Sequence, residues 1–243
     1  DKPHPTGRIV SPVPGAVFND PSVTIELETS GSRPIDRAEI VGFYTDFNWE
    51  GEGLDRQWHY RYLYGQMCSH VGTSTKGETP VKWYLQWMPT QKEPISLAAW
   101  IVDSSGIVYV SPAAENLRLA RRQTVRVLKP YEVPKAWSTR AGRTDRAKID
   151  VADDLGKAVD AKIVVSTWNG VAAEEIGIND RKVVVNVGRN HDLSYDEFPV
   201  PLEFIRQGTN TVYTHSTTEH HGIEVQWPGM VLFLRLDEPE PRP

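Results

Sequence analysis

The stretch from Leu202 to Leu236 constrains the fold more strongly than any other part of the sequence. Within it, Asn210 to Thr214 has the alternation of a strand with one buried face. The run from Met230 to Leu236 is apolar enough for an interior strand between two packed layers. A Pro228-Gly229 pair interrupts the extended segment that begins at Ile223. The stretch therefore predicts strands that are separated by turns and packed around a core.

Short strands with turn signals recur along the whole chain. Residues 23–27 alternate apolar and polar side chains, and Ser104-Ser105-Gly106 marks a hairpin turn. A polar and aromatic loop is expected from Asn48 to Gly77. In the second half we expect strands at 124–128, 146–151, 162–168, 182–187, 197–202, 210–214 and 223–235. This spacing predicts an all-β protein with little helix, built as two β-sandwich domains.

The pattern blurs between Pro112 and Pro134, and we place the domain junction there. A boundary near Arg121 gives a first domain of residues 1–121 and a second domain of residues 122–243. Basic residues gather around this boundary, and we interpret them as a solvated linker face: Arg118, Arg121, Arg122 and Arg126. The last residues, DEPEPRP, are expected to form a solvated tail.

Composition excludes several classes of function. The net charge of -5 argues against a nucleic-acid-binding protein, because no basic stripe is present to neutralise phosphates. Cys68 is the single cysteine, so neither an internal disulfide nor a cysteine metal site is expected. No apolar run approaches the length of a membrane span. The sequence begins with Asp1 rather than Met, and we therefore expect a mature or excised part of an exported chain.

Two pieces of the second half carry a family resemblance. "PVPLEFIRQGTNTV" and "AKIVVSTWNGVAAEEIGINDRKVVV" resemble galactose-binding-like β-sandwiches, in which a strand ends in Leu-x-x-Gly-x-Asn. The resemblance implies a jelly roll with Gly208 and Asn210 in the turn. The opening "GRIVSPVPGAVFNDPSVTIELETS" resembles bacterial immunoglobulin-like modules. Domains of both kinds occur as accessory regions of carbohydrate-active enzymes, but the folds alone do not define a function.

An acidic loop in the first half is a candidate calcium site. Hard cations prefer several oxygen ligands within one tight loop, and five residues within this loop offer them: Asp46, Asn48, Glu50, Glu52 and Asp55. Gly51 at the sixth position also resembles the first half of a calcium loop, but Gln57 stands where an EF-hand has Glu. The alternative is an ordinary acidic surface loop.

The same region is rich in aromatic residues. Trp49, Trp58 and His59 precede Tyr60, Tyr62 and Tyr64 in a segment that is otherwise polar. Sugar rings stack their C–H faces on aromatic rings, and their hydroxyls need polar partners nearby. This mixture makes Trp49, Trp58 and His59 candidate ligand-binding residues. The alternative is that the aromatic residues pack against protein.

A third constellation lies in the second domain. His191, Tyr195, His221 and Glu224 would meet if the loop 188–197 lies beside the loop 215–224. Sets of His, Tyr and carboxylate side chains bind sugars in proteins, and a Tyr/His pair abstracts protons in some polysaccharide lyases. The alternative is structural, with Gly222 shaping a bend and Trp227 capping the core. Zinc is disfavoured because the histidines lack a metal-ligand spacing.

These observations favour a non-catalytic carbohydrate-binding or accessory module of an exported polysaccharide-processing protein. Such a module would bind a polysaccharide or oligosaccharide, work beside further domains of a larger chain, and be secreted, periplasmic or at the cell surface. One alternative is a β-sandwich lyase or glycoside hydrolase that uses His191, Tyr195, His221 and Glu224. Another alternative is a structural or adhesion module, which a flat apolar patch or an exposed sheet edge would favour.

Overall fold

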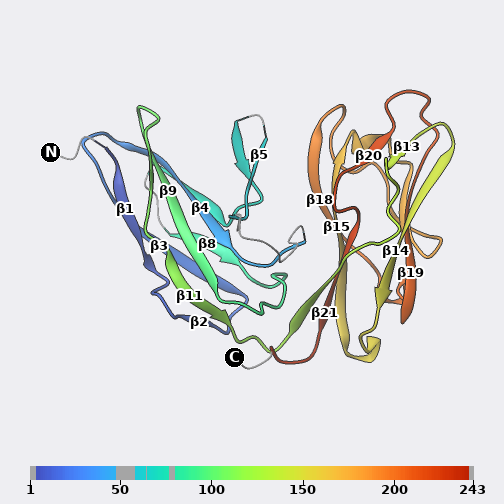
Figure 1. Cartoon of the computed structure of the whole chain (residues 1–243), viewed down its shortest axis with the longest axis horizontal. Helices are drawn as coiled ribbons and strands as arrows, with labels where there is room; N and C mark the ends of the chain where they lie inside the picture. The colour runs from blue at the N-terminus through green and yellow to red at the C-terminus, as the bar shows by residue number, and fades with distance from the viewer. Residues whose placement is uncertain (1–3, 48–57, 64, 77–79, 241–243) are drawn as a thin grey trace. The chain divides into compact units, whose positions relative to one another are not determined.

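The computed structural model describes residues 4–47, 58–63, 65–76 and 80–240, and strands dominate it (Figure 1). Helical structure within these residues is limited to the 3-10 turns η1 (Leu155–Lys157), η2 (Gly170–Ala172) and η3 (Leu202–Phe204). The predicted all-β class is therefore confirmed. None of the helical turns in the described part of the chain is long and apolar enough to cross a membrane.

The chain forms two compact units. The first contains Asp1–Asp46, Glu50–Arg122 and Pro239–Pro243, and the second contains Phe47–Trp49 and Gln123–Glu238. The C-terminal residues thus return to the first unit.

Two sheets face each other in the first unit. One has the strand order β1-β3-β8, and the other has the order β2-β11-β9-β4-β7 with β10 beside β9. A separate hairpin pairs β5 with β6. The strands are β1 (Thr6–Ser11), β2 (Val17–Phe18), β3 (Ser22–Ser30), β4 (Ile35–Phe43), β5 (Arg61–Leu63), β6 (Gln66–Cys68), β7 (Gly72–Thr75), β8 (Val81–Tyr84), β9 (Ile95–Asp103), β10 (Val108–Val110) and β11 (Ala114–Leu119).

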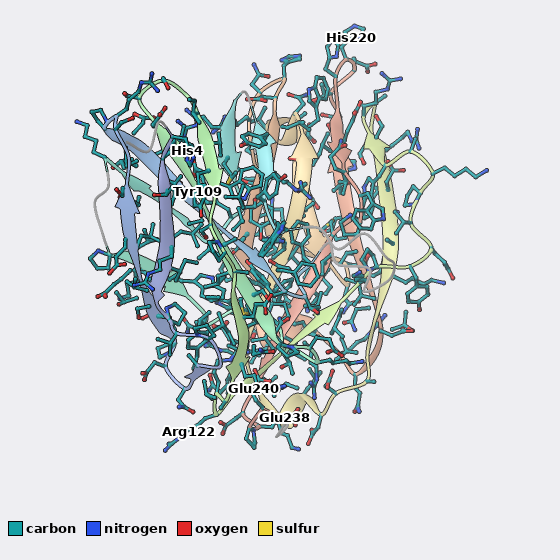
Figure 2. The ribbon with its side chains drawn as sticks, turned by 60° about the vertical axis from the view of Figure 1, so that its left-hand side comes forward. His4, Tyr109, Arg122, His220, Glu238 and Glu240 are labelled. Carbon is teal, nitrogen blue, oxygen red and sulfur yellow. The ribbon has the colours of Figure 1, made fainter. Side chains whose placement is uncertain are left out.

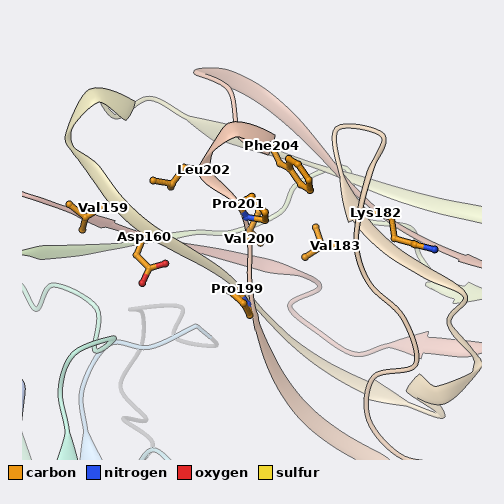
Figure 3. Close-up of a pocket in the computed structure, with 9 residues that line it drawn as sticks. All are labelled: Val159, Asp160, Lys182, Val183, Pro199, Val200, Pro201, Leu202 and Phe204. Carbon is orange, nitrogen blue, oxygen red and sulfur yellow. The ribbon is translucent and has the colours of Figure 1, made fainter.

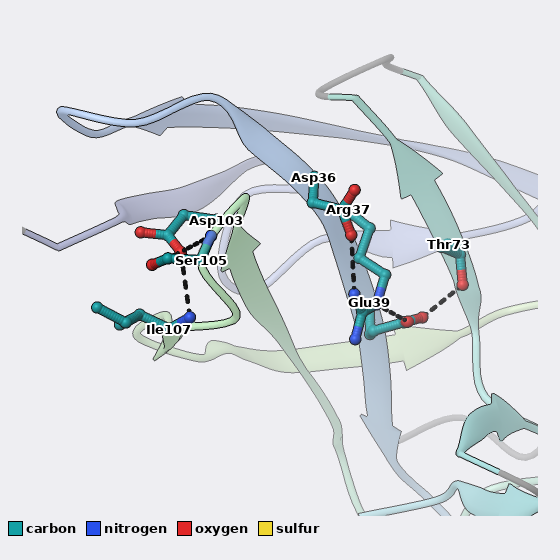
Figure 4. Close-up of polar contacts among 7 residues, drawn as sticks. All are labelled: Asp36, Arg37, Glu39, Thr73, Asp103, Ser105 and Ile107. Atoms are coloured by element: carbon teal, nitrogen blue, oxygen red, sulfur yellow. Dashed lines mark hydrogen bonds and ion pairs between the residues drawn. The ribbon is translucent and has the colours of Figure 1, made fainter.

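The alternation of apolar and polar residues along the strands places one face of each sheet in the core of the first unit. Ile25 on β3 and Trp83 on β8 pack with Ile40 on β4, Leu97 on β9 and Leu117 on β11. The predicted hairpin turn at Ser104-Ser105-Gly106 joins β9 to β10, and Gly106 has a φ of 83°. Asp103 closes this turn, because its Oδ1 accepts hydrogen bonds from Ser105 N–H and Ile107 N–H at 2.9 and 3.1 Å (Figure 4).

A polar network lies on the opposite face of the β4 sheet. Arg37 Nε donates to Glu39 Oε1 at 2.9 Å, and Thr73 Oγ1 on β7 donates to Glu39 Oε2 at 2.5 Å (Figure 4). His70 Nε2 lies 3.2 Å from the same Oε2 atom. Burial raises the pKa of Glu39, but the hydrogen bonds from His70 and Thr73, the charge of His70 and the bond from Arg37 outweigh it, so the pKa is lowered. The network fastens β7 to β4.

The second unit is also a sandwich. One sheet has the order β12-β21-β15-β20-β13 with β18 on the other side of β15, and the second has the order β14-β19-β16-β17. The strands are β12 (Thr124–Leu128), β13 (Ser138–Thr139), β14 (Arg143–Val151), β15 (Ala158–Trp168), β16 (Glu175–Ile178), β17 (Arg181–Val184), β18 (Leu193–Pro199), β19 (Gly208–Ser216), β20 (Ile223–Val225) and β21 (Val231–Leu236).

The longest strand of this unit, β15, shows how alternate residues along the sequence enter the core. On β15, Ala161, Ile163 and Val165 face the core, where they meet residues such as Ile149 on β14 and Val212 on β19. β20 and β21 both pair with β15, so the predicted segment 223–235 is one strand interrupted at Pro228-Gly229. This interruption agrees with the sequence analysis.

Two expectations about the fold are wrong. The segment expected as one loop from Asn48 to Gly77 contains the strands β5, β6 and β7. Trp227, expected to cap the core, is 56% exposed, and the buried indole among the described residues of the second unit is that of Trp137.

The expected solvated tail and linker face are in part buried. Glu240 is 7% exposed, and Arg121 Nε donates to its Oε1 at 3.1 Å. Glu238 accepts hydrogen bonds from Arg126 and Thr124. The charged composition of these segments suggested exposure to solvent, but Arg121, Arg126, Glu238 and Glu240 each have a partner of opposite charge.

Candidate ligand-binding site

Four loops of the second unit meet at one end of its strands. The antiparallel register pairs Arg143 with Ser216 and Glu175 with His215, and it pairs Trp168 with Leu193. The loops 140–142, 169–174, 185–192 and 217–222 therefore emerge at the same end. Ala141 N–H donates to the carbonyl of Thr218 at 2.9 Å, which joins the first loop to the last.

Three rings at this end of the unit form a cluster, here called the histidine cluster: Trp168 at the end of β15, and His191 and His221 from the loops. The ring centroids of His191 and His221 are 4.9 Å apart, and Trp168 lies 5.6 Å from His191 and 5.9 Å from His221. All three contacts are edge to face, the arrangement that aromatic quadrupoles favour. Both imidazoles belong to exposed residues. His220, the neighbour of His221, lies at the outer tip of its loop (Figure 2).

Asn169 holds the two histidine loops together from beneath. Its amide Nδ2 donates to the carbonyl of His221, and its Oδ1 accepts from the N–H of His191 at 3.0 Å. Its own backbone N–H donates to the carbonyl of Asp192 at 3.0 Å. The residue is 3% exposed and has a φ of 54°, a left-handed conformation that Asn tolerates better than most side chains. One buried side chain thus sets the position of both imidazoles.

The backbone at Gly222 is packed so closely that it leaves no room for a side chain. A Cβ at this position would lie 2.0 Å from the carbonyl oxygen of Thr139 and 2.6 Å from Cβ of Arg140. The backbone after His221 therefore packs directly on the end of β13, which agrees with the expectation that Gly222 shapes this loop.

The two remaining candidates lie on the strands that pair with the end of β15. Glu224 on β20 is the cross-strand partner of Trp168, so the two side chains share one face, and Glu224 is exposed. Tyr195 on β18 pairs with Ser166, two positions along the strand from the Trp168–Leu193 pair. Its hydroxyl donates to Glu197 Oε1 at 2.7 Å, which lies farther from the cluster along β18. The structure therefore brings His191 and His221 together and places Glu224 beside Trp168 of the same cluster, while the Tyr195 hydroxyl bonds to Glu197.

A buried polar network supports the site. Thr139 Oγ1 donates to Asp145 Oδ2 at 2.8 Å, and it lies 2.6 Å from Thr214 Oγ1. Trp137 Nε1 donates to Thr214 Oγ1 at 2.7 Å. Arg143 balances Asp145 with a contact of 3.1 Å. Because every member has a partner, the network fixes the ends of β13, β14 and β19 below the loops.

In the first unit, the described candidates are mostly engaged with protein. His59 Nε2 lies 3.0 Å from Asp46 Oδ2, and its ring packs 5.0 Å from that of Tyr44. Trp58 packs edge to face on Phe43 at 6.0 Å. Burial raises the pKa of Tyr44 well above its ordinary value, and the nearby Asp46 adds to this shift. Trp49, Asn48, Glu50, Glu52 and Asp55 lie outside the described residues.

No metal centre emerges from the part of the chain that the structure describes. Among those residues, no group of three or more His, Cys, Asp and Glu side chains is placed to hold an ion. Most of the acidic loop falls in the gap 48–57, so calcium binding there stays a prediction.

Sequence reasoning missed two residues of the site, Trp168 and Asn169. Trp168 ends an apolar strand pattern, and this position carries no signal of a binding role. Asn169 precedes Gly170, and an Asn-Gly pair is a signal for a tight, left-handed turn that could have drawn attention to this point.

Comparison with known proteins gives weak structural likeness only. No protein-family model and no curated protein matches the chain. A β-porphyranase of glycoside hydrolase family 86 from the human gut bacterium Bacteroides plebeius is 12% identical with a TM-score of 0.39, and the match covers 96% of this chain. The chain spans 38% of the length of that enzyme.

Two smaller proteins are also similar in structure. Fibronectin(III)-like modules of Clostridium thermocellum CbhA are 14% identical over 80% of this chain and 78% of theirs, with a TM-score of 0.31. A structure described as carbohydrate-binding modules from the β-sandwich superfamily is 12% identical over 99% of this chain and 98% of its own, with a TM-score of 0.26.

Proposed function

We propose that the chain is a non-catalytic carbohydrate-binding module of an exported polysaccharide-processing protein, and that the histidine cluster is its sugar site. In this proposal the first unit is an immunoglobulin-like sandwich and the second is a galactose-binding-like jelly roll that carries the ligand. Further domains of a larger chain would perform the chemistry.

The observation that carries the proposal is the ring cluster itself. His191 and His221 present exposed imidazoles beside Trp168, and each imidazole offers ring nitrogens that donate or accept hydrogen bonds. A sugar needs a ring surface for its C–H groups and polar atoms for its hydroxyls, and Glu224 beside Trp168 adds a carboxylate. The left-handed backbones of His191 and His221, held by the buried amide of Asn169, cost conformational energy that a plain turn does not require. The same restraint preorganises the two side chains for a ligand.

One contact favours binding over proton abstraction. A lyase that used Tyr195 and His191 as a pair would need the tyrosine hydroxyl near the imidazole. Here that hydroxyl donates to Glu197 at 2.7 Å instead. The lyase alternative of the sequence analysis therefore ranks below the binding module.

The test is a glycan array followed by titration of the best glycan. His221→Asn keeps a residue that tolerates the left-handed backbone but removes the imidazole, and it should weaken binding by roughly 1–2 kcal/mol, the scale of one lost hydrogen bond in a part-buried site. His220→Asn is the matched control, because His220 is exposed and outside the ring cluster. Wild-type protein that binds no glycan, or equal losses in both variants, would contradict the proposal.

A further inference from the structure

The second unit contains a pocket of about 490 Å³ (Figure 3). Its walls come from the start of β15, from β17, and from the chain between the end of β18 and η3. The register places Pro199 beside Lys162, whereas Trp168 at the cluster pairs with Leu193. The pocket and the cluster are therefore at different ends of the same strands, and they do not share residues.

The pocket is lined mainly by apolar side chains, and some of them pack against the core. Seven of its lining residues carry no polar side-chain atom: Val159, Val183, Pro199, Val200, Pro201, Leu202 and Phe204. Val183, Leu202 and Phe204 are partly buried and pack against the core cluster. The two prolines offer no N–H to water or ligand. An apolar group that fills this space would displace water from surface that the fold leaves uncovered.

The charged side chains at the pocket leave an excess of positive charge. Asp160 Oδ2 accepts from Arg235 Nη2 at 3.1 Å, and its Oδ1 accepts from Ala161 N–H at 3.0 Å, so the carboxylate is already compensated. Lys182 forms no ion pair with any carboxylate of the described residues. The Arg181 guanidinium lies 5.9 Å from the ring centroid of Phe204. The lining thus offers one cation, Lys182, to a ligand and no uncompensated anion.

Lys182 is an exposed lining residue, and its ammonium points away from the other lining residues (Figure 3). Exposed lysine rotamers exchange in picoseconds to nanoseconds. The ammonium can therefore meet a charged group at the mouth while the rest of a ligand fills the apolar space beside Val183.

We propose that this pocket binds small anionic amphiphiles, molecules with an aryl or alkyl body and a single carboxylate or sulfonate group. The body lies against Val183, Leu202 and Phe204, and the anionic group lies at Lys182. This second site is independent of sugar binding at the histidine cluster.

Two fluorescent probes that differ in one group test the proposal on the full chain. Anilinonaphthalene sulfonate carries the anionic group, and phenylnaphthylamine has the same ring framework without it. We expect one sulfonate probe per chain, and Lys182→Gln should weaken it about three- to fivefold, the size of an exposed ion pair, with no change for the neutral probe. Val159→Glu places a negative charge on an exposed lining residue, and it should weaken the sulfonate probe more than the neutral one.

Controls separate this site from other surfaces. Lys135→Gln changes an exposed lysine elsewhere on the unit and should leave both probes unaffected. His221→Asn should affect glycan binding but not the probes. No binding of the sulfonate probe to the folded chain, or equal losses in Lys182→Gln and Lys135→Gln, would overturn the proposal without bearing on the sugar site. Amide shifts in NMR spectra that avoid residues 181–184 and 199–204 would also overturn it.

Discussion

The imidazole rings of His191 and His221 meet edge to face, with 4.9 Å between their centroids and 71° between their planes. Their backbones have φ angles of 50° and 49°, a left-handed conformation that is uncommon for residues other than glycine. Two strained residues in contact need an external restraint, and the amide of Asn169 supplies one to each. The pair therefore depends on loops that are fixed together.

The first prediction concerns that restraint. Asn169→Gly keeps a left-handed backbone accessible but removes the amide that bonds the loops of His191 and His221. We expect the free energy of unfolding of the second unit to fall by roughly 2–3 kcal/mol, because buried backbone groups lose their partners. Sugar binding should be lost even where the unit is still folded. Urea denaturation and glycan titration measure the two effects.

Asn190→Gly is the control for this variant, since Asn190 is an exposed residue of the same loop. It should change neither stability nor binding appreciably. Full-strength glycan binding by Asn169→Gly would show that the amide does not position the histidines.

The second prediction compares two tryptophans. Trp137 is 4% exposed and its Nε1 donates to Thr214 at 2.7 Å, so Trp137→Ala should destabilise the second unit by about 3–5 kcal/mol. Trp227 is 56% exposed, and Trp227→Ala should change stability by less than about 1 kcal/mol. Denaturation curves of the two variants decide this. Equal losses would mean that Trp227 is more deeply packed than its exposure indicates.

Much of this fold could be predicted from the sequence, because alternation and turn residues act locally. The strand Thr124–Leu128 and the hairpin turn at Ser104-Ser105-Gly106 were expected where the structure has them. The domain limits 1–121 and 122–243 stay a prediction, and limited proteolysis between residues 112 and 135 tests them.

The rest depended on pairing between distant segments. Trp168 enters the site because β15 pairs with Glu224 of β20, and no local pattern states that register. Asn169 contacts two loops that are far from it in sequence. Glu240 lies in a tail whose composition suggests solvent, yet it reaches Arg121 in the first unit. Only the tertiary fold assigns these partners.

The third prediction uses the lowered pKa of Glu39. Since the folded pKa lies below the ordinary value of 4.5, the carboxylate stabilises the first unit fully above that pH, and the contribution is lost as the pH falls through the folded pKa. Glu39→Gln should therefore cost stability at neutral pH, and the cost should shrink below pH 4.5. Urea midpoints across this range measure it. Glu28→Gln, in an exposed pair with Arg8, is the control. A cost that is constant with pH would refute the linkage.

The fourth prediction is calcium binding by the acidic loop at 46–55. Asp46, at its start, already lies 3.0 Å from His59 Nε2, so ion binding should compete with this contact. We expect calorimetry to detect heat on adding calcium and Asp46→Ala to reduce it, while Asp36→Ala, an exposed carboxylate on β4, should not. No heat, together with an unchanged melting temperature on adding EDTA, would leave an ordinary acidic loop.

The last prediction concerns the buried pair of Arg121 and Glu240, which are 7% exposed each. The Arg121 guanidinium also donates to the carbonyls of Leu85 and Met88, at 2.5 and 2.9 Å. Glu240→Gln would leave a buried cation without its counter-charge, and we expect the first unit to lose about 2–4 kcal/mol, less than a fully stranded charge because two carbonyls still accept from it. Arg121→Met with Glu240→Met should recover part of that loss, because neither charge is then buried alone. Thermal and urea unfolding of both variants measure this, with Glu219→Gln as an exposed control. A Glu240→Gln variant as stable as the wild type would mean that the C-terminal residues leave the first unit in solution.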